Sequence, residues 1–224
     1  MGEIKRIVTI RDQVYQILRD EICSGKYPPG SWLQEQELTE HLGVSRSPVR
    51  ESLRRLVADG LLVEIPNKGV FVKEFTQRDI DEIFDMRLML ESYAIRKSRG
   101  RMTSARLKKL VELLDKLERT HGAGDLAAYT RTDELLHNRI VELGENSLVI
   151  STYDRVRSMI RQFRVLSLTS RKRFAESLEE HRKLVHLLAV GDVEAACAVN
   201  TYHLQMACQC IKEHLSELPS HEEQ

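Results

Sequence analysis

Four side chains of types that bind metal ions interrupt apolar helical stripes in the second half of the sequence. Asp133 and His137 are four residues apart, so they share one helical face with Leu136. His181 and His203 each interrupt the apolar stripe of another predicted helix. Three imidazoles and one carboxylate suit Zn²⁺, Ni²⁺, Mn²⁺ or a related divalent ion. The spacing also allows the alternative, which is a set of independent, hydrogen-bonded core residues.

An arginine in an apolar stripe suggests a second chemistry. Arg87 lies among Ile83, Phe84 and Leu90, with Glu91 one helical turn further on. A guanidinium group can bind a ligand carboxylate through two parallel hydrogen bonds. An arginine and a metal ion that face one cavity would make a site for a small organic acid. The alternative is an ion pair between Arg87 and Glu91 within the helix, at a domain interface.

Arginines in the first third of the chain form a separate cationic stripe. Arg46, Arg50 and Arg54 are four residues apart, beside an apolar stripe that contains Val49. Residues 46–55 hold four arginines and one glutamate, whereas the whole chain balances 34 Lys and Arg against 34 Asp and Glu. A uniformly basic protein is therefore excluded, and any nucleic-acid binding must be local and salt-dependent. The alternative is a solvated surface helix.

The elements around these arginines predict a winged helix-turn-helix domain over residues 1–74. Gly43 predicts a helix end, and Ser45 predicts a helix start with a capping hydroxyl. Pro48 then takes the third helical position, where its missing N–H costs no intrahelical bond. Lys68 lies at the tip of a predicted hairpin, where it either reaches DNA or only solubilises a turn. The predicted elements are helices over 11–24, 34–42 and 45–56, a very short strand at 32–33, and strands over 61–65 and 70–72.

Residues 75–224 predict an all-α antiparallel six-helix bundle, so the fold class is mainly α. The pattern has helical periodicity throughout, and capping residues precede short connections. The predicted helices begin at Thr76, Thr103, Asp125, Asn146 or Ser147, about Arg173, and Asp192, and they end near Arg99, His121, Leu143, Leu168, Val190 and Leu218. Residues 1–10 and 219–224 are predicted to be loose ends.

Composition excludes several classes of protein. No run of 18 apolar residues could span a membrane, and the first residues lack the apolar region of a signal peptide. The four cysteines have no zinc-ribbon spacing. We therefore expect a cytoplasmic protein without membrane partners.

Most of the chain resembles a known family. Pro29–Leu56, followed by Asp59–Leu62 and Asn67–Val72, is similar to the winged-helix pattern of the GntR family of transcription regulators. The second half resembles the FCD effector domain of the FadR subfamily, in its short, VanR-like form. That similarity rests on Arg87 and Glu91, Asp133 and His137, Glu180 and His181, Gly191-Asp192, and His203.

The resemblance implies a homodimer that binds a palindromic operator, one recognition helix to each half-site. Arg46 and Arg50 match the family's DNA-contacting arginines. Ser47, Asn67, Lys68 and Gly69 match supporting contacts. Gln36 departs from the arginine found in some members, so a DNA contact there is weaker or missing.

The resemblance also implies a ligand-controlled function. Asp133, His137, His181 and His203 match metal-ligand positions, and the implied effector is a small carboxylate near the metal. The leading prediction is a DNA-binding regulator, a repressor, and not an enzyme. One alternative is a sensor of the metal ion itself. A metallohydrolase is the other, although the sequence has no evident general base beside the ligands.

Overall fold

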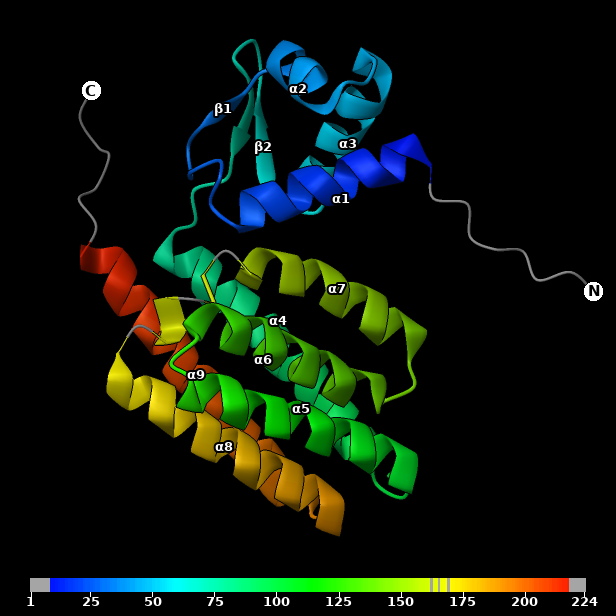
Figure 1. The fold of residues 1–224 in the computed structure, drawn as a ribbon, viewed down its shortest axis with the longest axis vertical. Coiled ribbons are helices and arrows are strands. Elements are labelled where there is room, and N and C mark those ends of the chain that lie inside the picture. The colour runs from blue at the N-terminus through cyan, green and yellow to red at the C-terminus, as the bar shows by residue number, and fades with distance from the viewer. Residues whose placement is uncertain (1–8, 162, 165, 169, 218–224) are drawn as a thin grey trace, which may run out of the picture. The chain divides into compact units, whose positions relative to one another are not determined.

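The chain forms two compact units, one ending at Glu74 and the other beginning at Phe75. The computed structural model describes residues 9–161, 163–164, 166–168 and 170–217 (Figure 1). The elements of the first unit are α1 (Ile10–Cys23), β1 (Trp32–Leu33), α2 (Glu35–Leu42), α3 (Arg46–Ala58), β2 (Leu62–Ile65) and β3 (Gly69–Val72). Those of the second are α4 (Gln77–Lys97), α5 (Ser104–Gly122), α6 (Leu126–Glu142), α7 (Ser147–Arg161), a 3-10 turn (Leu166–Leu168), α8 (Arg171–Val190) and α9 (Val193–Glu217).

The first unit is a three-helix domain with a small sheet. Its strands are antiparallel in the order β1-β3-β2, with Trp32 opposite Phe71 and Leu62 opposite Val72. Buried residues of α1 and α3, such as Leu18 and Leu53, form its core together with the sheet. This is the winged helix-turn-helix arrangement that the sequence predicted.

The ends of the predicted elements are largely as the local chemistry indicates. Gly43 ends α2 in the left-handed conformation, with φ of 64°, and Pro48 is the third residue of α3. Ser45 precedes α3 with extended backbone, but its side chain makes no capping hydrogen bond, so that detail of the prediction was wrong. The predicted N-terminal tail was too long by two residues, because Thr9 caps α1 in a reciprocal pair with Asp12. The remaining predicted loose ends lie outside the described residues.

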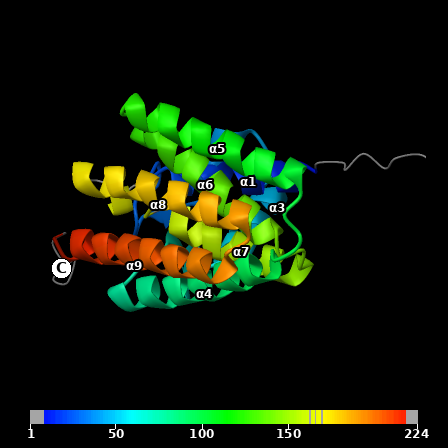
Figure 2. The ribbon, with the colours of Figure 1, turned by 90° about the horizontal axis from the view of Figure 1, so that it is seen from below.

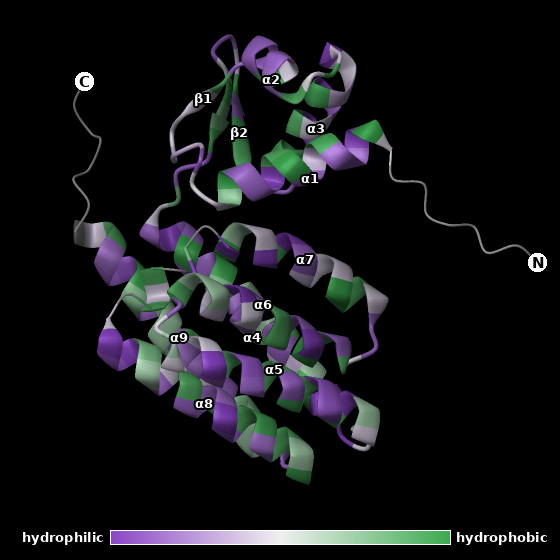
Figure 3. Cartoon of the chain, in the orientation of Figure 1, coloured by the Kyte–Doolittle hydropathy of each residue, from purple (hydrophilic) through white to green (hydrophobic). Residues whose placement is uncertain are grey.

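The second unit is a helical bundle. Helices α4 and α9 lie side by side, and α5 packs against α6 and α8 (Figures 1 and 2). Hydrophobic segments alternate with hydrophilic ones along each helix, as expected for helices that bury one face (Figure 3). The described residues of this unit contain the predicted six α-helices, and Thr76, Thr103 and Asp125 all cap them through their side chains.

The largest departure from the prediction concerns the fourth helix of the bundle. It was predicted to continue to about Leu168, but α7 ends at Arg161 and a 3-10 turn follows. Val156, Ile160 and Phe163 are all buried, at intervals of four and three residues, so the helical apolar pattern continues past the end of α7. No glycine or proline marks the end of the helix. The break is accompanied instead by a tertiary contact, which Arg164 makes with Asp133 of α6. Helix α8 also begins two residues earlier than predicted, after a cap by Ser170.

Candidate metal centre and nucleic-acid interface

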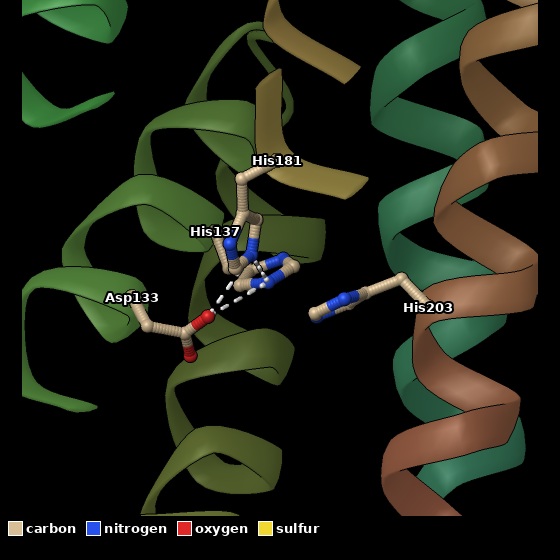
Figure 4. A group of neighbouring side chains, drawn as sticks. All are labelled: Asp133, His137, His181 and His203. Atoms are coloured by element: carbon tan, nitrogen blue, oxygen red, sulfur yellow. Dashed lines mark hydrogen bonds and ion pairs between the residues drawn. The ribbon is translucent and has the colours of Figure 1, made fainter. Parts of the chain in front are cut away.

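The four predicted metal ligands lie together in the core of the helical unit. Asp133 and His137 project from α6, His181 from α8 and His203 from α9 (Figure 4). Each offers one ligand atom, and these four atoms all lie within 4.8 Å of one another. All four residues are at most 5% exposed. The helices therefore assemble the N₃O set that the sequence could only suggest.

The distances within this cluster define its centre. The Nε2 atom of His181 lies 3.0 Å from Oδ1 of Asp133 and 3.3 Å from Nε2 of His137. The Nε2 atom of His137 lies 3.6 Å from the same carboxylate oxygen. The ring of His203 approaches from the opposite side, with its centre 4.6 Å from that of His181 (Figure 4).

Each histidine is oriented by a partner at its other ring nitrogen. The Nδ1 atom of His137 lies 2.9 Å from Oε2 of Glu91, and Nδ1 of His203 lies 2.7 Å from Oε2 of Glu180. Because a carboxylate only accepts, the proton of each of these two rings is assigned to Nδ1, and Nε2 keeps its lone pair.

His181 is oriented by a hydroxyl group in the same manner. Its Nδ1 atom lies 3.3 Å from the hydroxyl of Tyr129, which lies 3.1 Å from the hydroxyl of Ser177. Tyr129 can accept from Nδ1–H, and the Nε2 lone pair of His181 then also faces the centre. Partners of this kind fix the tautomer and direction of metal-binding histidines.

The electrostatics favour the protonation states that bind metal. Burial, reinforced by the other two histidines, holds the pKa of His203 well below its usual value. Burial also lowers the pKa of His181, although Asp133 opposes this shift. Burial raises the pKa of Asp133, but Arg164, His137 and His181 outweigh it and hold the pKa well below the usual range. Neutral imidazoles beside a carboxylate are the forms that coordinate a cation.

Arg87 takes part in a buried network rather than standing alone. Its Nε–H donates to Oε1 of Glu91 at 2.7 Å, and the hydroxyl of Tyr153 donates to the same oxygen at 2.8 Å. Arg87 is 3% exposed and Glu91 is fully buried. The ion pair within the helix, which the sequence offered as the alternative to a ligand-binding arginine, therefore exists. Oε2 of Glu91 joins this pair to the candidate metal ligand His137.

Arg164 and Arg173 are two further buried arginines of this site. Arg164 donates to Oδ2 of Asp133, on the side of the carboxylate that faces away from the histidines. Arg173 forms a bidentate ion pair with Glu180, at 2.7 and 2.8 Å. No sequence pattern indicated a role for Arg164, Arg173 or Tyr129. Glu180, the partner of Arg173, was indicated by the sequence, because Glu180 and His181 are one of the residue pairs that resemble the FCD effector domain.

Several buried polar atoms of this region have no hydrogen-bond partner among the described residues. They are Nη2 of Arg87, Nε and Nη2 of Arg164, Nε of Arg173, and both side-chain atoms of Asn200. Asn200 is fully buried and precedes His203 by one turn on α9. Arg87 and Arg164 both act electrostatically on Tyr153. A buried donor without a partner is unfavourable by about 1–3 kcal/mol, and a bound ion, water or ligand can supply the missing partner.

The candidate nucleic-acid interface is in the first unit. Arg46, Ser47, Arg50 and Arg54 are all exposed on α3, whose opposite face is anchored by buried Val49 and Leu53. At the wing turn, Asn67 and Lys68 are exposed, and Gly69 is half-buried. Gly69 has φ of 114°, and a Cβ atom there would lie 2.7 Å from Nε1 of Trp32. Only glycine fits this position without movement of its neighbours.

The second helix contributes a carboxylate near the arginines of α3. Glu35 forms a bidentate ion pair with Arg50, with both N–O distances 2.9 Å. Gln36 stands where some members of the family that the sequence resembles have an arginine. Its side-chain N–H donates to Glu40 on the same helix at 3.2 Å.

No helix among the described residues is long and apolar enough to cross a membrane.

Comparisons with known proteins agree with this architecture. Residues 10–72 match the family model described as bacterial regulatory proteins, gntR family, and residues 82–206 match the model of the FCD domain. The chain is 29% identical over 206 residues to the HTH-type transcriptional regulator YdhC of Bacillus subtilis (strain 168), covering 92% of each chain. It is 30% identical over 181 residues to the Nta operon transcriptional regulator of Aminobacter aminovorans, covering 80% of this chain and 83% of the relative. The structure of McbR/YncC from E. coli aligns with a TM-score of 0.82 and 25% identity, over 93% of this chain and 100% of that one.

Proposed function

Because this chain belongs to the GntR family of bacterial regulatory proteins and carries an FCD domain, we propose that it is a transcriptional repressor controlled by a metal-bound carboxylate. GntR-family regulators bind operator DNA, and the families that match are families of regulators rather than enzymes. The single observation that supports control by a ligand is the buried cluster of Asp133 and three histidines. Arginine N–H groups around it have no partner within the described part of the chain.

DNA recognition would rest on the exposed face of α3 and on the wing. Arg46, Arg50 and Arg54 present three positive charges on one helical face. An arginine that binds a guanine through two hydrogen bonds contributes about 1–3 kcal/mol of discrimination between bases. Ser47 and the wing residues Asn67, Lys68 and Gly69 would contact the backbone or the minor groove. A homodimer would place two such faces on the two half-sites of a palindrome.

The metal would bind Oδ1 of Asp133 and the Nε2 atoms of His137 and His181, with His203 as the fourth ligand. These residues fit a divalent ion, because their second ring nitrogens already have partners and their lone pairs converge. Zn²⁺, Ni²⁺ and Mn²⁺ all accept imidazole and carboxylate ligands. When bound, such an ion supplies positive charge and coordination positions for an acid.

The charge balance of the core favours an acid with two carboxylates. The buried Lys, Arg, Asp and Glu side chains described in the helical unit are three arginines and three carboxylates, so they balance. They are Arg87, Arg164, Arg173, Glu91, Asp133 and Glu180. A divalent ion would add two positive charges in a region of low dielectric, where uncompensated charge is costly. A dicarboxylate would compensate both charges and would bind the unpartnered N–H groups of Arg87 and Arg164.

The DNA-binding part of the proposal is tested by Arg50→Ala. We expect this variant to lose binding to an operator selected from a random DNA pool, while its circular dichroism and thermal unfolding stay unchanged. Arg55→Ala is the matched control, because Arg55 lies on another face of α3, where it pairs with Asp12. Normal operator binding by Arg50→Ala would refute the assignment of α3 as the recognition helix.

The ligand-binding part is tested by operator release at controlled metal. With Zn²⁺, Ni²⁺ or Mn²⁺ present, a library of small mono- and dicarboxylates is added, and release from the operator is measured by fluorescence anisotropy. We expect a dicarboxylate to release the wild type, with little effect on His181→Ala or Arg87→Met. The alternative function, a sensor of the ion itself, predicts release by a chelator or by the metal without dependence on any acid.

A further inference from the structure

Arg50 is held by a carboxylate of a neighbouring helix. Glu35, the first residue of α2, accepts from Nε of Arg50 through Oε1 and from Nη2 through Oε2, each at 2.9 Å. The two side chains remain partly open to solvent, with exposed fractions of 55% for Arg50 and 36% for Glu35. The pair is therefore exposed enough to meet a ligand while its arginine has a fixed direction.

The geometry of this pair leaves one edge of the guanidinium group for another partner. A guanidinium carries five N–H groups in one plane. Glu35 takes the Nε–H and one N–H of Nη2, which form one edge of that plane. The second N–H of Nη2 and the two of Nη1 are left, and one N–H from each of these two nitrogens forms the outer edge. This edge can donate two parallel hydrogen bonds to O6 and N7 of a guanine.

The charge of Glu35 acts on the whole arginine stripe. The hydrogen bonds from Arg50, together with the positive charges of Arg50, Arg46 and Arg54, lower the pKa of Glu35, so the group is ionised at neutral pH. An ionised carboxylate among three arginines reduces the local positive charge from three to two. It also repels a phosphate that approaches Arg50 from the side of Glu35.

We propose that Glu35 is a specificity-determining positioning residue, which holds Arg50 so that its outer edge reads a base and is not diverted to a phosphate. The proposal rests on the DNA-contacting role of Arg50 and goes beyond it, because it assigns a role in selectivity to a residue that carries the wrong charge to bind DNA. Glu35 would lower affinity for DNA in general and raise affinity for the operator.

Glu37 provides the comparison that separates this role from simpler ones. Both glutamates lie in the first turn of α2, where a negative charge stabilises the helix. Glu37 is exposed, and no contact with Arg50 is described for it. A role limited to the helix end or to net charge would therefore belong equally to both residues.

The experiment compares Glu35→Gln with Glu37→Gln in the full-length protein. Affinities are measured by anisotropy for the operator selected by the wild type, for the same operator with each base pair changed singly, and for random duplex DNA at several salt concentrations. For Glu35→Gln we expect operator affinity to fall by about 2- to 10-fold per half-site, because the side chain of Arg50 loses its fixed direction. Affinity for random DNA should rise, with a salt slope steeper by about 0.9 for each arginine that moves to a phosphate.

The base-pair series supplies the readout that a structural role would not alter. Discrimination should be lost only at the base pair where Arg50→Lys also loses it, and Glu37→Gln should keep the full wild-type profile. The proposal is overturned if Glu35→Gln keeps its operator-to-random ratio within about twofold of the wild type. Equal losses in both glutamine variants, or losses spread over all base pairs, would overturn it as well. If Arg50→Ala still binds the operator, it is the recognition helix that has been misassigned.

Discussion

Replacement of Glu91 by glutamine is the most informative perturbation of the helical core. Glutamine keeps the size of the side chain but removes the charge that faces Arg87. It also replaces one acceptor oxygen by an NH₂ donor. Because Arg87, Tyr153 and His137 all donate to this carboxylate, the new NH₂ group would face another donor. Since Glu91 is fully buried and Arg87 is 3% exposed, solvent cannot take over the lost interactions.

The expected effect is a large loss of stability. Breaking a buried ion pair by removing one partner costs about 3–5 kcal/mol, because the other charge stays buried without compensation. Single domains have a total free energy of unfolding of about 5–15 kcal/mol, so Glu91→Gln should remove a substantial part of it.

Urea unfolding measures this loss, and the chain supplies its own control. Arg78 and Glu82 form a pair with the same four-residue spacing on the same helix, but they are 88% and 64% exposed. Glu82→Gln should leave the unfolding curve unchanged within error, since exposed pairs are screened. Circular dichroism follows the helices, most of which are in the second unit, whereas the single tryptophan, Trp32, reports on the first. The shift should therefore appear in the dichroism curve.

A small loss would refute this reasoning. If Glu91→Gln unfolds within about 1 kcal/mol of the wild type, then Arg87 has another carboxylate within reach or the network is hydrated. An equal loss in Glu82→Gln would show that helix charge, and not burial, determines the effect.

The stability of the protein should depend on pH and on metal, and the reactivity of one thiol should depend on a neighbouring carboxylate. Arg87 and His137 hold the pKa of Glu91 below its unfolded value of 4.5, against the effect of burial. The unfolded chain therefore binds more protons, and the free energy of unfolding should fall as pH decreases below about 4.5. A free energy of unfolding, measured with urea, that stays constant between pH 7 and 3 would contradict this. Zn²⁺, Ni²⁺ or Mn²⁺ is added to chelator-treated protein at a free concentration 100 times the dissociation constant of that ion. The bound ion should then stabilise the protein by about 2.7 kcal/mol and raise its Tm by about 5–11 °C. The Tm of His181→Ala should not change. Burial and Asp81 raise the pKa of Cys208 to about 11, so iodoacetamide should label this thiol slowly at pH 8. Labelling should be faster in Asp81→Asn, and equal rates in the two proteins would contradict the role of Asp81.

Local chemistry made much of the fold predictable. Helix starts at Thr76, Thr103 and Asp125 are fixed by side chains that bond to backbone N–H groups three residues away, and such signals are visible in the sequence. The interrupted apolar stripes indicated Asp133, His137, His181 and His203, because a polar residue on a buried helix face needs a hydrogen-bond partner or a bound ion. That they share one centre depends on how α6, α8 and α9 pack, which spacing along the chain does not encode.

The rest of the site depends on tertiary contacts. Arg164 follows the end of α7, where buried residues continue the helical spacing, so the sequence indicated neither the break nor the inward direction of this arginine. Tyr129 and Arg173 looked like ordinary helix residues. Their roles come from partners on other helices or more than one turn away, Tyr129 from His181 and Arg173 from Glu180.

N–H groups of Arg87 and Arg164 have no partner among the residues that the structure describes. If the proposed metal and acid bind there, ligand supply would determine the lifetime of the protein in the cell. A core that lacks these partners opens more often than one in which a ligand provides them, and proteases cleave chains in their open state. Ligand-free molecules should therefore be degraded faster than loaded ones. A cell that lacks the metal or the acid would then hold fewer copies of the repressor, and its genes would respond to the abundance of the protein as well as to its affinity for the operator.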